Sequence, residues 1–198
     1  MSSILRTVVL SVGILVLFSC ASIEWESNKA PDYSQKIASL YIMVNVPELT
    51  VTKTVPSQSK MHQEPDKYVG VKFGDYLKDD LLDAFAKSNI PVQATALGGL
   101  EMDLSEAKDA ARQMGAKATL IVELTGKPEK PDLATSLLFY PKTVTNTFYV
   151  TISDSELDKP IWKARYPMST VYGYNSSEVD QMVKKLMATL RKDALLEE

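Results

Sequence analysis

The stretch AKDAARQMGAKATLIVELTG, residues 107–126, indicates the fold class because it joins a helix directly to a buried strand. A helix over residues 103–114 is predicted by an apolar stripe at helical spacing. The stripe consists of Ala107, Ala110, Ala111 and Met114. Asp103 and Glu106 form an Asx-x-x-Glu start that resembles a capping box, and Gly115 suits the left-handed residue that follows a helix. The apolar run 118–124 then predicts a strand that is buried on both faces.

The segment before this unit predicts a strand, a helix and a second strand. The strands cover residues 36–46 and 91–97, and the helix covers residues 75–87 with Asp75 as its N-cap. Residues 48–72 are polar and irregular, with a short strand at 49–55 as an alternative.

The segment after it predicts an antiparallel hairpin and a last helix. Apolar and polar residues alternate over 144–152 and again over 161–170. Ser177 and Asp180 resemble a cap for a C-terminal helix that ends near Leu196. The predicted order is therefore β-α-β-α-β-β-β-α. It defines an α+β fold in which a mixed sheet carries its helices largely on one face.

Residues 107–126 also resemble a pattern found in bacterial envelope proteins, in which an alanine-rich helix ends in Gly-Ala and an apolar strand ends in Gly. This pattern is similar to the α/β domains of curli-secretion lipoproteins, of lipoprotein activators of penicillin-binding proteins, and of the TolB N-terminal domain. The resemblance implies docking to partner proteins and no catalytic residues. It does not imply a channel, because this chain has no recognisable pore-forming insertion.

The N-terminus predicts a bacterial lipoprotein signal. Arg6 precedes an apolar run over residues 7–18, which is shorter than the roughly 20 residues that span a bilayer. Leu17-Phe18-Ser19-Cys20 then resembles a lipobox, although Phe18 is bulkier than the usual residue there. The resemblance implies cleavage before Cys20, lipidation and acylation of that residue, and, from Ser22, an outer-membrane destination. The alternatives are an ordinary secretory signal and an uncleaved anchor.

This interpretation divides the chain into a signal peptide (1–19), a lipidated tether (20–35) and a single α+β domain (36–198). Dual acylation would anchor the mature chain stably to a membrane of the bacterial envelope, facing the periplasm. Trp25 interrupts the tether, and we expect it to pack onto the domain; the alternative is an aromatic at the level of the lipid headgroups.

Charge and composition exclude several classes of function. The formal net charge is 22 − 25 = −3, and it becomes −4 when Arg6 is removed, which argues against nucleic acid as a partner. One Cys and one His allow no intrachain disulfide and are too few for a zinc site. His62 lies in a polar segment without a nucleophile beside it.

The remaining polar motifs suit structural roles. Gly98-Gly99 suits a turn, and Asp79 and Asp80 are adjacent on a helix, so their side chains diverge. Asp154, Glu156 and Asp158 suit a solvated hairpin tip better than a calcium site. We therefore expect no enzyme activity, no cofactor and no metal.

The apolar cluster within residues 133–141 is the main candidate for partner contact. It contains Leu137, Leu138, Phe139 and Tyr140. Apolar residues in a loop fold over the domain as a flap, contact a partner or touch lipid.

Two functions follow from the cluster. The first is an adaptor that binds another envelope protein through a sheet edge or through the loops 48–72 and 127–143. The second is a carrier that holds a small apolar ligand or lipid beneath the 133–141 flap. Tyr166, Tyr172 and Tyr174 are expected to pack in the core or at an edge, with an exposed binding rim at Tyr172-Gly-Tyr174 as the alternative.

Replacing the predicted lipid attachment site tests the anchor directly. Cys20→Ser is expected to move the protein from membranes to the soluble fraction while the domain stays folded, because the thioether lipid can no longer form. Membrane fractionation and mass analysis of the native protein measure this. A variant that remains uncleaved and membrane-bound contradicts the lipobox.

Overall fold

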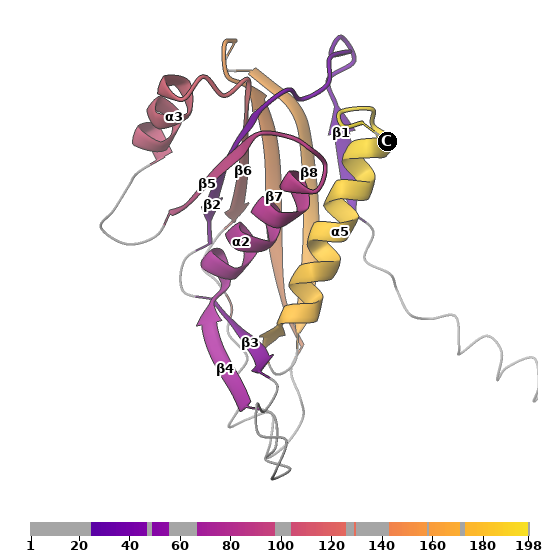
Figure 1. The fold of residues 1–198 in the computed structure, drawn as a ribbon. Helices are drawn as coiled ribbons and strands as arrows, with labels where there is room; N and C mark the ends of the chain where they lie inside the picture. The colour runs from indigo at the N-terminus through magenta and orange to yellow at the C-terminus, as the bar shows by residue number, and fades with distance from the viewer. Residues whose placement is uncertain are drawn as a thin grey trace, which may run out of the picture.

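The computed structural model describes residues 25–46, 49–55, 67–97, 104–125, 129, 143–157, 159–170 and 173–197. In chain order its elements are β1 (Glu26–Lys29), β2 (Leu40–Asn45), β3 (Thr50–Val55), β4 (Lys67–Lys72), α2 (Phe73–Ala86), β5 (Val92–Leu97), α3 (Leu104–Gln113), β6 (Ala118–Leu124), β7 (Val144–Asp154), β8 (Lys159–Thr170), β9 (Tyr174–Asn175) and α5 (Ser176–Lys192). They form two sheets and three helices (Figure 1).

The main sheet is mixed, as predicted. Its six strands lie in the order β1-β8-β7-β6-β2-β5. β2 runs parallel to β5 and β6, whereas β6, β7, β8 and β1 pair antiparallel. The parallel strands are joined through helices, because a parallel connection needs a long crossover. A smaller sheet, ordered β4-β3-β9, extends beyond one end of the main sheet.

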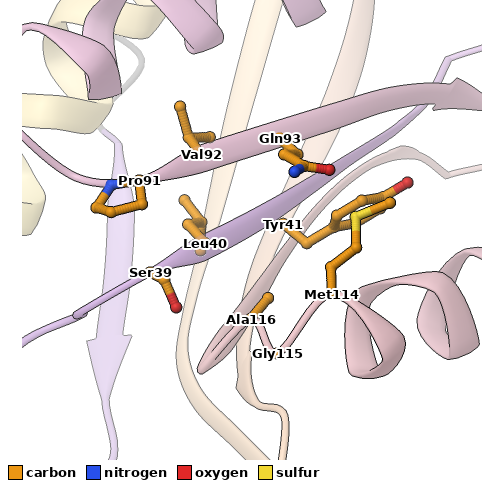
Figure 2. Close-up of a pocket in the computed structure, with 9 residues that line it drawn as sticks. All are labelled: Ser39, Leu40, Tyr41, Pro91, Val92, Gln93, Met114, Gly115 and Ala116. Carbon is orange, nitrogen blue, oxygen red and sulfur yellow. The ribbon is translucent and has the colours of Figure 1, made fainter.

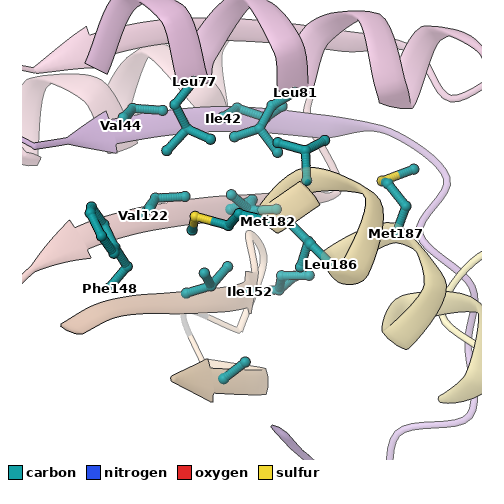
Figure 3. Close-up of a cluster of buried hydrophobic side chains, with 14 of the residues drawn as sticks. Ile42, Val44, Leu77, Leu81, Val122, Phe148, Ile152, Met182, Leu186 and Met187 are labelled. Carbon is teal, nitrogen blue, oxygen red and sulfur yellow. The ribbon is translucent and has the colours of Figure 1, made fainter. Parts of the chain in front are cut away.

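Two of the three helices cover one face of the main sheet, which confirms the predicted fold class. Figure 3 shows Leu77 and Leu81 of α2, and Met182 and Leu186 of α5, directed at the strands. Their partners on the sheet include Ile42, Val44, Val122, Phe148 and Ile152, all fully buried. Helix α3 lies on the opposite face, where Ala107 and Ala111 pack with Tyr41, Met43 and Ile121. The small alanines permit that close approach.

Two predicted helix caps are wrong. Helix α2 begins at Phe73, two residues before the predicted cap Asp75, and its N-cap Lys72 makes no side-chain capping bond. Phe73 is buried and its ring stacks on Phe148 with centroids 5.0 Å apart, so packing fixes this helix start. Helix α5 begins after Asn175, whose side chain forms a reciprocal capping box with Glu178.

The end of α5 also differs from the prediction. The helix stops at Lys192, and Ala194 turns the chain with φ at 56°. Leu195 and Leu196 then pack into the core outside the helix, which explains why their apolar character extended the predicted helix.

The strands differ from the prediction at β1, β4 and the start of β2. Residues 26–29 lie in the predicted tether, yet they form β1 and pair with β8. In the segment 48–72, the optional strand at 49–55 is present as β3, and β4 pairs antiparallel with it. Strand β2 begins only at Leu40, not at residue 36. The polar sequence ESNK of β1 has no apolar alternation, because an edge strand with exposed side chains needs none.

Contacts between the two ends of the described chain hold β1 and α5 together. The Nε1 atom of Trp162 donates to Asp193 Oδ2 at 2.7 Å, and Lys29 Nζ donates to the Asp193 carbonyl at 2.8 Å. The Trp25 ring lies 5.3 Å from that of Tyr166 and 6.1 Å from that of Trp162. The expectation that Trp25 packs onto the domain is therefore confirmed.

Truncating a side chain under the helix layer tests the core. Leu81→Ala is expected to lower the free energy of unfolding by about 2–5 kcal/mol, because Leu81 is fully buried and its removal leaves a cavity. Leu157→Ala is the control, since Leu157 is 66% exposed and its change should stay within about 0.5 kcal/mol. Urea unfolding measures both, and equal losses would contradict this assignment of the core.

Candidate functional site

A hollow lies where the parallel strands begin and α3 ends (Figure 2). It has a volume of about 320 Å³ and is lined by Ser39, Leu40, Tyr41, Pro91, Val92, Gln93, Met114, Gly115 and Ala116. Gly115 takes φ at 70°, as predicted, and lets the chain reverse into β6. Figure 2 shows Tyr41, Gln93 and Met114 among the residues that line the hollow.

The side chains that line this hollow are apolar or uncharged. No residue with an acidic or basic side chain lines it. It also lies at the amino ends of β2, β5 and β6, whereas open α/β sheets bind ligands outside the carboxyl ends of their strands. Met114 is 53% exposed beside it, an adaptable apolar side chain at the surface.

Strand β5 forms one edge of the main sheet next to this hollow. Among the described residues, β5 pairs only with β2. The Leu40 amide donates to the Pro91 carbonyl at 2.9 Å, so Pro91, Gln93 and Thr95 direct their backbone groups at β2. The alternate residues Val92, Ala94 and Ala96 therefore point their backbone N–H and C=O groups away from the sheet.

The two edges of the main sheet differ in how they are protected. β1, at the opposite edge, has only four residues and carries Glu26 and Lys29. Short length and charge discourage pairing with another strand. β5 has six residues, VQATAL, without a charge or a proline. Among the described residues, β5 is therefore the outer strand of the main sheet that is better suited to pair with another strand.

Several predicted candidates fall outside the described residues. These are Cys20, His62, Gly98-Gly99, Asp158, Tyr172 and the cluster Leu137, Leu138, Phe139 and Tyr140. The loop 127–143 is described only at Glu129 and Thr143, where Glu129 exchanges two backbone hydrogen bonds of 3.0 Å with the Asn146 side chain. The flap that the carrier hypothesis needs is thus not part of the described structure.

The predicted acidic groups lie at two separate places, the turn between β7 and β8 and helix α2. Asp154 Oδ1 accepts from the amides of Glu156 and Leu157 at 2.9 Å, and Glu156 pairs with Lys117 Nζ at 2.6 Å. Asp79 is exposed beside Lys78, while Asp80 turns toward α5, so the predicted divergence is confirmed. In the described ranges, no cluster of three or more His, Cys, Asp or Glu is able to hold a metal.

The aromatic residues near the last strand lie in the core. Tyr174 is buried and donates from its hydroxyl to the Met168 carbonyl at 3.3 Å. It also accepts from Asn146 Nδ2 at 2.7 Å. Its alternative role in an exposed rim is therefore wrong.

The edge of β5 was missed by sequence reasoning, although the absence of charge from residues 92–97 was a signal for it.

Comparison with known proteins identifies no family. The sequence matches no protein-family model, and no curated protein matches it. A PelC dodecamer from Paraburkholderia phytofirmans is 10% identical, covers 88% of this chain and 99% of its own, and has a TM-score of 0.46. Lipoprotein GNA1162 from Neisseria meningitidis is 12% identical over 77% of this chain and 98% of its own, with a TM-score of 0.37.

A third solved structure, protein XCC0632 of the DUF330 family from Xanthomonas campestris, is 11% identical. It covers 84% of this chain and 93% of its own, with a TM-score of 0.38. One of the three is a lipoprotein by name, and similarities this distant carry no conclusion about this chain. Within the described part of the chain, no helix has the length and apolar character needed to cross a membrane.

The buried tyrosine of the hollow gives a test by pH. Burial raises the pKa of Tyr41 above its ordinary value of 10.0. The stability that this shift contributes is fully present below pH 10.0 and is lost as the pH rises above it, because the unfolded chain ionises more easily.

Between about pH 8 and about pH 11, the free energy of unfolding of the Tyr41→Phe variant is therefore expected to fall less steeply than that of the wild type. Urea unfolding at the two pH values measures the difference in slope. Other buried tyrosines contribute to the slope of unfolding free energy against pH in both the wild type and the variant, so only the difference between the two slopes reports on Tyr41. Equal slopes would mean that the Tyr41 hydroxyl is solvated.

Proposed function

We propose that this chain is a non-enzymatic adaptor of the bacterial envelope, which is lipid-anchored at Cys20 and binds an extended segment of another envelope protein along β5. The open edge of β5 is the observation that carries the proposal. A segment added to this edge would complete hydrogen bonds with Val92, Ala94 and Ala96, and the hollow would receive one of its side chains. The proposed location is the outer membrane, facing the periplasm.

The position of β1 supports a partner that lies near the membrane. Because Trp25 and β1 already belong to the domain, only residues 21–24 separate it from the lipidated cysteine. The five Cα–Cα steps from Cys20 to Trp25 span at most about 18 Å at full extension. Five strand spacings of about 4.8 Å then separate β1 from β5. The Leu97 end of β5, which is level with Glu26 in the strand registers, therefore stays within roughly 42 Å of the lipidated residue.

A proline at the outward face of β5 tests the binding edge. Ala94→Pro removes an amide that points away from β2, so the sheet is expected to stay intact while strand addition is blocked. A photo-crosslinking residue at the exposed Gln93, used in intact cells, is expected to capture a partner segment when position 94 keeps its alanine. The yield should fall by at least about tenfold in the Ala94→Pro variant, because the ladder loses a central bond.

The control places a proline at the opposite edge. The amide of Ser27 points away from β8, since its neighbours along the strand bond to that strand. Ser27→Pro is therefore expected to keep the capture at Gln93. The adaptor proposal fails if both variants capture equally, or if the captured segment is β5 of a second copy of this chain.

A further inference from the structure

The outer surface of the helix layer holds a groove between α2 and α5. The two helices run in the same direction: Tyr76 Oη donates to Asp180 Oδ1 at 2.9 Å near their starts, and Arg191 donates to Ser88 Oγ at 3.1 Å near their ends. The groove between these bonds has a volume of about 460 Å³. It is lined by Tyr76, Asp80, Ala84, Lys87, Asp180, Val183, Lys184, Met187 and Arg191.

Charge is separated along this groove. Asp80 and Asp180 form its acidic end, whereas Lys87 and Arg191 form its basic end. Val183 and Met187 are buried in the floor between the two ends. A rise of 1.5 Å per residue places the ends about 10 Å apart on α2 and about 16 Å apart on α5.

One carboxylate oxygen at the acidic end has no partner. Asp80 Oδ2 is buried and makes no hydrogen bond within the described part of the chain. Burial, followed by the neighbouring Asp180 and Asp83 carboxylates, raises the pKa of Asp80, and Lys87 and Lys184 offset part of that rise. A buried acceptor without a donor is unfavourable.

The other members of the acidic end are held in place. Burial, followed by the hydrogen bond to Asp180, raises the pKa of Tyr76 to about 12, so its hydroxyl stays a donor at neutral pH. That bond occupies one oxygen of Asp180. Lys184 lines the same groove, yet among the described residues no group donates to Asp80 Oδ2, and a lysine or arginine side chain of a partner would supply that donor.

We propose that the α2–α5 groove binds an amphipathic helix of a partner protein. This helix places a lysine or arginine at the acidic end, apolar side chains on the floor and a carboxylate at the basic end. The distance between the ends corresponds to side chains seven to eleven positions apart on a helix. This distance between the acidic and basic ends exceeds the separation of the two charges in a free amino acid, so a small zwitterion does not reach both ends. A surface between two parallel helices also suits a third helix.

Crosslinking from inside the groove tests this proposal. The full chain, with a photo-crosslinking residue at Ala84, is expected to capture a partner segment that has the required order of basic, apolar and acidic residues. Asp80→Asn is expected to lower the yield by about tenfold or more, since a charge-assisted hydrogen bond is lost. Asp79→Asn is the matched control: it makes the same change of charge one residue away, outside the groove, and keeps the yield.

Two further measurements separate binding from folding. Asp80→Asn should unfold at the same temperature as the wild type or higher, because it removes a buried unpaired carboxylate. Lys87→Gln, an exposed change at the basic end, should also lower the yield.

The proposal is overturned by equal losses from Asp79→Asn and Asp80→Asn, by equal capture from the exposed Gln181, or by an adduct that is a small molecule. A captured segment without the charge order, or no captured segment, also overturns it. The inference depends on neither the lipid anchor nor β5. Ala94→Pro leaves the groove intact, so a failure at one surface is distinguishable from a failure at the other.

Discussion

The burial of α2 and α5 against one face of the main sheet fixes the position of the other elements. Strand β2 carries most of this constraint, because Ile42 and Val44 face the two helices while Tyr41 and Met43 face α3. Both of its edges are also paired, with β5 and β6. A strand that is enclosed on all sides leaves no freedom of register, since a shift of one residue would exchange its two faces. A partner therefore has no access to β2 itself.

The sequence predicted best those elements whose burial shows in the local spacing of apolar residues. The bounds of β6 match the prediction, because its apolar run is continuous and Gly115 marks the preceding helix end. The hairpin of β7 and β8 was predicted from alternation that the structure reproduces as alternating burial. The stripe of α5 was likewise predicted, while its cap was not, because Asn175 and Ser177 are equally good capping residues by type.

The rest depends on contacts between distant parts of the chain. Strand β1 is polar and becomes a strand only because β8 and Asp193 hold it. The role of β5 as an edge follows from the strand order, which no local pattern encodes. The groove needs Tyr76 beside Asp180, residues that are far apart in sequence. Helix periodicity places Asp80 and Asp180 near apolar stripes, yet it does not say that the two stripes meet.

Both candidate surfaces combine exposure with a feature that stability alone does not favour. An uncharged edge strand invites unwanted pairing, and the opposite edge shows that this fold can protect itself with charge and a short strand. An unpaired buried atom is by itself weak evidence, since Trp25 Nε1 and Ser155 Oγ share that property. Asp80 differs because a carboxylate is far more unfavourable to bury than a neutral donor or hydroxyl, and because this residue lines the α2–α5 groove. A protein selected for stability alone would replace Asp80 with asparagine or an apolar residue. Its presence there therefore points to a lysine or arginine of a bound partner, which would offset the cost of burying the carboxylate.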